Sequence, residues 1–83
     1  MATKKKTPVK TYSKLNIDFG EHLRSLRKEK GLSLRQMEEQ CDLDNSNISK
    51  IENGKFDIQL STIVELAKGL NVHPRELLDY RFI

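Results

Sequence analysis

Residues 44–50 carry the side chains that are most suited to chemical recognition. The run Asp-Asn-Ser-Asn-Ile-Ser-Lys places amide, hydroxyl and ammonium groups close together, with little net charge. Such groups can hydrogen-bond to the edges of nucleobases: an asparagine amide pairs with adenine through two bonds, and a lysine reaches the acceptors of guanine. The surface of a solvated helix has the same composition. The residue types alone therefore leave both recognition and simple solvation open.

Groups that could support catalysis are few. His22 and His73 stand apart in the chain and form no motif with a serine or cysteine nucleophile, and no glycine-rich phosphate loop occurs. The single cysteine, Cys41, excludes an internal disulfide framework and cannot build a zinc site alone. We therefore expect a protein that is not an enzyme, with no cofactor, no metal and no small-molecule ligand.

The elements that precede residues 44–50 are predicted to be two helices. Asn16 or Asp18 can cap the first, which continues to residue 30 with apolar residues at steps of three and four, and Gly31 ends it. Ser33 is a good N-cap for the second, over residues 34–41, and Gln36 completes a capping-box pattern. The apolar residues that we assign to the buried stripes are Phe19, Leu23, Leu26, Leu34, Met37 and Cys41.

Three further helices are predicted. Asp44 can cap a helix over residues 45–53, which Asn53-Gly54 ends. Residues 60–70 form an amphipathic helix with Asn71 as a left-handed cap, and His73-Pro74 opens a short fifth helix. Its apolar stripe is Leu60, Ile63, Val64, Ala67 and Leu70. Five short helices with short connections predict an all-α, compact domain.

The positive charge of the chain is concentrated at its N-terminus. The formal net charge is +3, but residues 1–15 contain five lysines (Lys4, Lys5, Lys6, Lys10 and Lys14) and no acid, which leaves a net −2 for residues 16–83. We therefore predict a flexible basic arm over residues 1–15 and one folded domain over residues 16–83. The arm is either a solubilising tail or a contact to a polyanion, and any such contact from the folded part must depend on a local patch.

Size and hydropathy restrict the remaining possibilities. No apolar run approaches the about 18 residues that a membrane span needs, and the N-terminus lacks the apolar stretch of a secretory signal. We expect a cytoplasmic protein. Since a chain of 83 residues forms only a small core, burial against a partner by dimerisation is also expected.

The segment from residue 31 to residue 55 carries an extended motif. It reads GLSLRQMEEQCDLDNSNISKIENGK, and its second half is Ile-Ser-Lys-Ile-Glu-Asn-Gly-Lys. This segment resembles the Cro/repressor (XRE-type) helix-turn-helix family, which includes small phage-type repressors and restriction-modification controller proteins. The flanks LRSLR and LAKGLNV agree as well, so the resemblance covers about residues 17–79. It implies a lambda-repressor-like domain whose third helix lies in the major groove of double-stranded DNA.

The resemblance also implies roles for individual residues. Base-reading positions are Asp44, Asn45, Ser46, Ser49 and Lys50, although Asp44 is better explained as a helix cap. Phosphate contacts are Ser33, Arg35, Asn47 and Lys55. Arg35 stands in the first turn of a helix, which disfavours a cation, so a nearby phosphate would explain its position; a chance surface position is the alternative. Arg27 and Glu52 are expected to form a partly buried ion pair that fixes the angle of the third helix.

Three residues depart from the family pattern. Glu38 stands where the family usually has a small alanine, and Asp42 replaces the usual turn glycine. Aspartate tolerates the left-handed conformation better than most residues. Leu34 occupies a position that is often a glutamine in contact with phosphate. These departures affect the packing and the phosphate contacts of the second helix.

The apolar C-terminus predicts a dimer interface formed by Leu77, Leu78, Tyr80, Phe82 and Ile83, unless the tail folds back over its own core. One recognition helix reads few base pairs, so a homodimer on a pseudo-palindromic operator is expected. The function predicted is a sequence-specific, nucleoid-associated transcription regulator. The alternative is an antitoxin-like or scaffolding module whose main partner is a protein.

Overall fold

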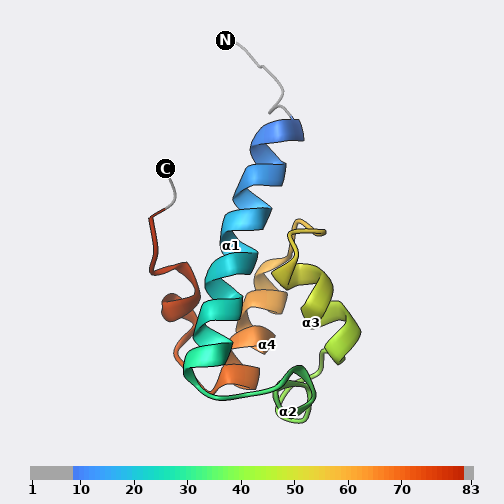
Figure 1. The fold of residues 1–83 in the computed structure, drawn as a ribbon, viewed down its shortest axis with the longest axis vertical. Helices are drawn as coiled ribbons and strands as arrows, with labels where there is room; N and C mark the ends of the chain where they lie inside the picture. Colours follow the sequence, from blue (N-terminus) through green and yellow to red (C-terminus); the bar gives the residue numbers. More distant parts are fainter. Residues whose placement is uncertain (1–8, 82–83) are drawn as a thin grey trace.

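A computed structural model describes residues 9–81, with side chains from residue 14 to residue 81. Four α-helices and one short 3-10 helix follow one another in this range: α1 (Val9–Glu29), α2 (Leu34–Glu38), α3 (Asn45–Glu52), α4 (Leu60–Leu70) and η1 (Pro74–Leu78) (Figure 1). Residues 9–81 contain no strand, so the all-α class is confirmed. The prediction of a fifth α-helix is wrong, because residues 74–78 form only a 3-10 helix that Asp79 ends.

Helix α1 starts earlier than the sequence suggested. The predicted start at Asn16 or Asp18 is wrong, since the helix begins at Val9. Asp18 does not cap the helix but accepts a hydrogen bond from Lys14 Nζ at 3.1 Å, one turn earlier on the same exposed face. Residues 9–15 of the predicted basic arm are therefore helical. Lys4, Lys5 and Lys6 lie outside the described residues.

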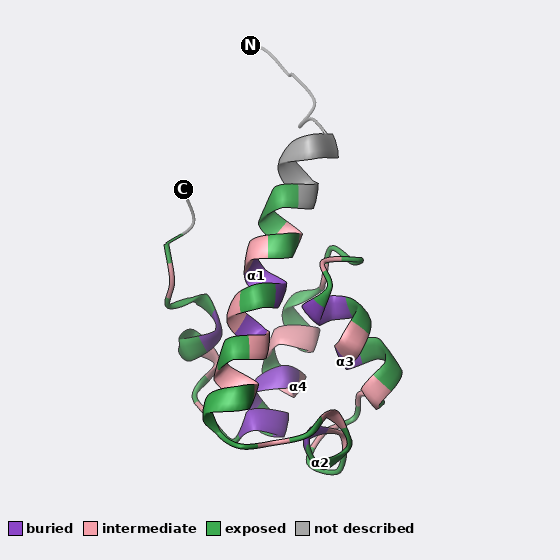
Figure 2. Ribbon diagram, viewed as in Figure 1, coloured by how far each residue is buried: buried purple, intermediate pink, exposed green. Residues whose placement is uncertain are grey.

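The core lies where α1, α3, α4 and η1 meet, with α2 at one end (Figure 2). Figure 1 shows α3 and α4 on one side of α1, and η1 with the C-terminal segment on the other. The buried apolar residues are Phe19, Leu23, Met37, Ile48, Ile51, Leu66, Ala67, Leu70 and Leu77. No helix within residues 9–81 combines the length and apolar character that crossing a membrane requires.

The stripe predicted for α4 is only partly right. Leu60 is 78% exposed and Val64 is 40% exposed, whereas Leu66, which the pattern omitted, is fully buried. The C-terminal half of α4 packs against η1 and α2, so the buried side of the helix is set by those neighbours and not by its own apolar period. Asn71 has the predicted left-handed conformation, with φ of 58°.

Candidate nucleic-acid interface

Helix α2 is fixed at its start by a capping box. Ser33 Oγ accepts a hydrogen bond from the Gln36 N–H at 3.0 Å, and the Ser33 N–H donates to Gln36 Oε1 at 2.8 Å. Each side chain thus satisfies a backbone group of the other residue, as the sequence predicted. The hydroxyl hydrogen of Ser33 takes no part in this capping box, so Ser33 can still donate one hydrogen bond.

Helix α2 is shorter than expected, and the loop between α2 and α3 is longer by the same residues. Helix α2 ends at Glu38, so the predicted extension to residue 41 is wrong. Asp42 is not left-handed either. Instead its N–H donates to Glu65 Oε1 of α4 at 3.0 Å. This backbone donor, together with Lys68, lowers the pKa of Glu65 below its ordinary value. The turn is therefore held from α4, a contact that the sequence did not indicate.

Helix α3 begins at the predicted cap. Asp44 Oδ1 accepts from the Asn47 N–H at 2.8 Å, so Asp44 caps the helix as the sequence predicted. Two isoleucines, Ile48 and Ile51, are buried beneath the helix. The side of α3 turned away from them carries the exposed residues Ser46, Asn47 and Lys50, with Asn45 and Ser49 half-buried beside them. The structure therefore brings the polar residues of 44–50 onto one short, rigidly anchored surface.

The end of α3 is tied to α1 by a buried ion pair. Arg27 Nε lies 2.6 Å from Glu52 Oε2, and Arg27 Nη2 lies 3.0 Å from Glu52 Oε1. The Glu52 side chain is 2% exposed and the Arg27 side chain 12%. Hydrogen bonding to Glu52 raises the pKa of Arg27 above its ordinary value, although burial acts in the opposite direction. Arg27 Nη1 also donates to the Leu32 carbonyl at 2.9 Å, so one guanidinium joins α1, the loop before α2 and α3.

Sequence reasoning missed a second arginine in this contact. Arg24 Nε lies 3.3 Å from Glu52 Oε1, and Arg24 Nη2 donates to Asn53 Oδ1 at 2.9 Å. The signal was available, because Arg24 precedes Arg27 by three residues and therefore shares its helix face. Asn53 in turn donates to the Ser49 carbonyl at 2.9 Å. The C-terminal end of α3 is thus held by α1 through two cations.

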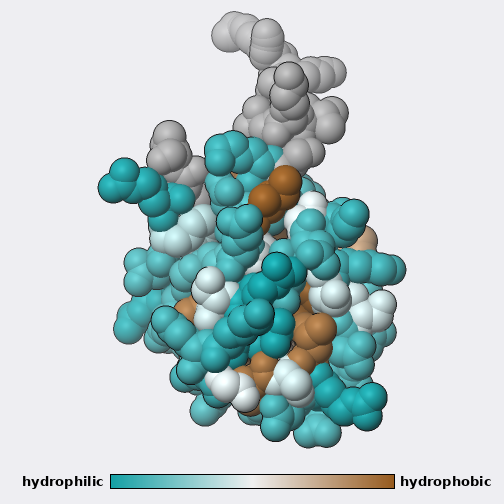
Figure 3. Space-filling model, viewed as in Figure 1, coloured by the Kyte–Doolittle hydropathy of each residue, from teal (hydrophilic) through white to brown (hydrophobic). Residues whose placement is uncertain are grey.

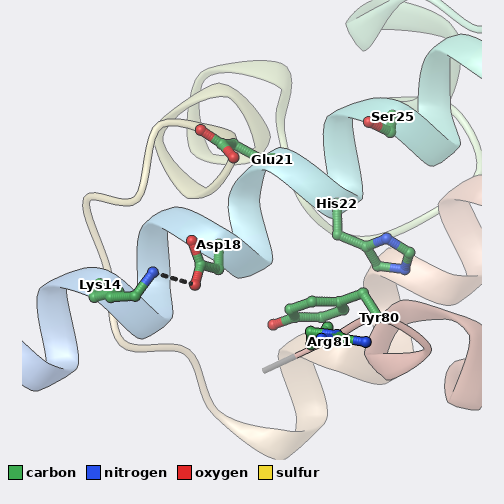
Figure 4. A pocket seen from close by; sticks show the side chains of 7 residues that line it. All are labelled: Lys14, Asp18, Glu21, His22, Ser25, Tyr80 and Arg81. Carbon is green, nitrogen blue, oxygen red and sulfur yellow. Dashed lines mark hydrogen bonds and ion pairs between the residues drawn. The ribbon is translucent and has the colours of Figure 1, made fainter. Parts of the chain in front are cut away.

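The titratable groups considered for catalysis have structural partners. His22 Nε2 lies 2.7 Å from the Glu76 carbonyl, and the His22 and Tyr80 rings lie with centroids 4.6 Å apart. These two residues line an open hollow of about 380 Å³ between α1 and the C-terminal segment (Figure 4). His73 Nδ1 accepts from the Arg75 N–H at 3.1 Å. Burial raises the pKa of the Cys41 thiol. Within residues 9–81, no three His, Cys, Asp or Glu side chains cluster as a metal site.

Comparison with known proteins identifies the family of this fold. The helix-turn-helix family profile matches residues 23–77, which includes α2, the turn and α3. The chain belongs to this family. It is a DNA-binding helix-turn-helix transcription regulator of the XRE type, as the motif in residues 31–55 indicated.

Similar proteins share this architecture over most of their length. The control protein C.BamHI of Bacillus amyloliquefaciens is 34% identical over 83% of this chain and 86% of its own. The control protein C.MunI of a Mycoplasma species is 41% identical over 78% and 89%. The crystal structure of the restriction-modification controller protein C.AhdI from Aeromonas hydrophila matches with a TM-score of 0.72 at 39% identity, over 80% of this chain and 94% of that one.

In this helix-turn-helix protein the residues expected to contact phosphate lie at the start of α2, in the first turn of α3 and in the loop after α3. Ser33 and Arg35 are exposed at the start of α2, and Asn47 is exposed in the first turn of α3. Lys55 is exposed in the loop after α3, next to Gly54, whose φ of 73° turns the chain away from the helix. Asn47 belongs to the polar surface of α3 itself, so these residues lie before, within and after that surface along the chain.

Proposed function

We propose that the protein binds a pseudo-palindromic operator as a homodimer, with α3 in the major groove. The observation that carries this proposal is the anchored polar surface of α3, where Ser46 and Lys50 are exposed while Ile48 and Ile51 are buried. Its cap at Asp44 and the ion pair at Glu52 restrict the helix at both ends. Likeness to the restriction-modification controller protein C.AhdI and to two control proteins supports regulation of restriction-modification genes as the biological role.

Selection of bound sequences from random DNA duplexes tests this function. We expect a two-fold repeat with half-site centres about 34 Å apart, which is one helical turn of DNA. Binding that shows no sequence preference, at low ionic strength and at concentrations where the protein self-associates, would contradict the proposal.

Lys50 is proposed to read a base. We expect Lys50→Ala to relax the preference at one base pair of each half-site. Binding to the preferred base should weaken by about 1–3 kcal/mol relative to the other bases. The measurement is competition binding with duplexes that vary at single positions. Lys28→Ala removes the same charge from an exposed position on α1 and should leave all base preferences unchanged. Equal base preferences in the Lys50→Ala and wild-type proteins would exclude this role.

The residues proposed to contact phosphates are exposed within the motif of residues 31–55: Arg35, Lys55, Asn47 and Ser33 through its hydroxyl. Phosphate contacts fix the register of a protein on DNA and supply affinity that falls with salt. Residues 16–83 carry a net charge of −2, so these local donors have to supply that part of the affinity.

The proposed dimer surface differs from the one that the sequence suggested. Leu77 is fully buried in the core of its own chain, so its assignment to the interface is wrong. Leu78 is 41% exposed and, with Tyr80, lines an apolar groove of about 170 Å³ that Leu15 and Phe56 also line. Phe82 and Ile83 lie outside the described residues. The face drawn in Figure 3 is mostly hydrophilic, with hydrophobic residues in small separate patches. We propose that the groove around Leu78 is covered by the second copy.

A charged residue at position 78 should therefore weaken self-association. We expect Leu78→Lys to shift the protein to monomer in sedimentation equilibrium, because the ammonium group would have to be buried in the dimer. Leu60→Lys is the matched control, since Leu60 is 78% exposed and does not line the groove. A wild-type protein that stays monomeric at every concentration would exclude the homodimer, and a larger effect at residue 60 would move the interface to α4.

A further inference from the structure

Glu38 makes a contact with the recognition surface that the family pattern does not predict. Its carboxylate reaches from α2 across the turn to the first residue of α3. Oε1 of Glu38 accepts the Asn45 backbone N–H at 2.6 Å and the Asn45 side-chain Nδ2 at 2.7 Å. Both residues are half-buried, so water competes less for these bonds than it does at an exposed surface.

This contact fixes which way the Asn45 amide faces. A carboxylate accepts hydrogen bonds and donates none, so the NH₂ end of the amide has to face Glu38 and the carbonyl end has to face away. The reversed orientation would set the Asn45 carbonyl against the carboxylate, acceptor against acceptor. The order of donor and acceptor on Asn45 is therefore determined by Glu38.

The contact also determines which hydrogen of the amide remains available. Because one Glu38 oxygen serves both the backbone N–H and Nδ2 of Asn45, it lies on the backbone side of the side chain. It therefore takes the Nδ2 hydrogen that points back toward Cβ. The second Nδ2 hydrogen and Oδ1 point outward together, as a donor beside an acceptor.

An outward donor beside an acceptor complements one base edge in the major groove. Adenine offers an acceptor at N7 and a donor at N6, whereas guanine offers acceptors at both N7 and O6. We infer that Glu38 is a positioning residue that makes Asn45 specific for adenine. This inference rests on the proposed function, in which α3 lies in the major groove.

Binding preferences of two Glu38 variants test the inference. Glu38→Gln keeps an oxygen that can accept both hydrogen bonds, and Glu38→Ala keeps none, while both remove the same negative charge. We expect Glu38→Ala to lower the preference for adenine over guanine at one base pair of each half-site about tenfold, which is within the range for one bidentate pair. We expect Glu38→Gln to retain that preference, and the other base pairs to be read as in the wild type.

Asn45→Ala defines which base pair is concerned. It should abolish the preference at that position, and Glu38→Ala should have no further effect there in the Asn45→Ala background. Three results would overturn the inference: an unchanged adenine preference in Glu38→Ala, an even loss of affinity across all positions, or equal relaxation in Glu38→Gln and Glu38→Ala. An even loss would show that Glu38 only supports α3. A wild-type protein without any sequence preference is a different result, since it contradicts the proposed function.

A measurement without DNA keeps the two questions separate. In the free protein, the NMR order parameter of the Asn45 side-chain amide should be high in the wild type and in Glu38→Gln, and it should fall in Glu38→Ala. A mobile Asn45 amide in the wild type would contradict the positioning role whatever the DNA experiments show.

Discussion

Arg27→Met is expected to lower the free energy of unfolding by about 3–5 kcal/mol, which is the usual cost of removing one partner from a buried ion pair. The Glu52 side chain is only 2% exposed in the wild-type structure. The substitution removes its two closest hydrogen bonds, at 2.6 and 3.0 Å. Arg24 remains 3.3 Å from the same carboxylate, so we expect the loss to fall near the lower end of that range. The Arg27 bond to the Leu32 carbonyl is lost as well.

Urea denaturation followed by circular dichroism measures this loss. Arg24→Met is the matched control, because the Arg24 side chain is 39% exposed and an ion pair near water contributes at most about 1 kcal/mol. A double variant, Arg27→Met with Glu52→Leu, should recover much of the stability, since it leaves no buried charge unpaired. An unchanged melting temperature in Arg27→Met would refute the structural role of the pair. At temperatures where the variant is folded, base preferences should be close to those of the wild type.

Local signals in the sequence predicted the element ends that depend on a few neighbouring residues. The capping box at Ser33, the cap at Asp44 and the left-handed cap at Asn71 are all confirmed. Each depends on bonds within one turn of the chain, so residue types at fixed spacing are sufficient to predict it. The bounds of α4 also agree with the prediction, which used its apolar period and the Asn71 cap. Gln59 before α4 makes no side-chain cap bond.

Features that depend on contacts between elements were predicted poorly. Asp18 has the right type for a cap but lies inside α1, because the preceding residues continue the helix. Leu77 was expected at a dimer surface, yet it is buried in the core. The sequence cannot separate these cases, because an apolar residue near a chain end is compatible with both. The burial of Leu66 depends on where α4 meets α2 and η1, which the period of α4 does not encode.

The sequence singled out the polar residues of α3 but not all of the contacts that hold them in place. The polar positions of α3 followed from their types and from the family motif, whereas the Arg27–Glu52 pair followed from the family resemblance alone. Glu38 was identified only as a departure from the motif, because its role depends on how a side chain of α2 crosses the turn to Asn45. Gly20 was passed over, although a glycine in the middle of a helix usually has a packing reason.

Gly20 allows α1 to approach the backbone at the end of α3. A Cβ atom at this position would lie 2.5 Å from the Ile51 carbonyl oxygen, 2.7 Å from the Glu52 carbonyl carbon, and closer still to the Glu52 carbonyl oxygen. Real Cβ atoms essentially never approach other atoms this closely. Because these are backbone atoms, they cannot move aside by a change of rotamer. The Arg27–Glu52 pair joins the same two helices as this close approach.

Two effects of opposite sign act on Gly20→Ala, and their magnitudes decide the outcome. Alanine is favoured over glycine inside a helix by about 1 kcal/mol. Overpacking usually costs about 1–3 kcal/mol and occasionally more, and here the obstruction is backbone. Because backbone atoms obstruct the new methyl group, we expect an overpacking cost at or above the upper end of that range. The net loss is then about 2 kcal/mol or more, with α3 displaced relative to α1.

Thermal and urea denaturation of three alanine variants measures the balance. Ser25→Ala lies on the exposed side of the same helix and should change stability by less than about 0.5 kcal/mol. Gly31→Ala meets no atom within 4 Å, so it should show only the cost of its left-handed φ of 70°, about 1–2 kcal/mol. Gly20→Ala should be less stable than both, and DNA affinity should fall even where the variant is folded, because the angle of α3 depends on this contact. If Gly20→Ala were instead more stable than the wild type, helix propensity would outweigh the contact, and α1 would not approach α3 this closely.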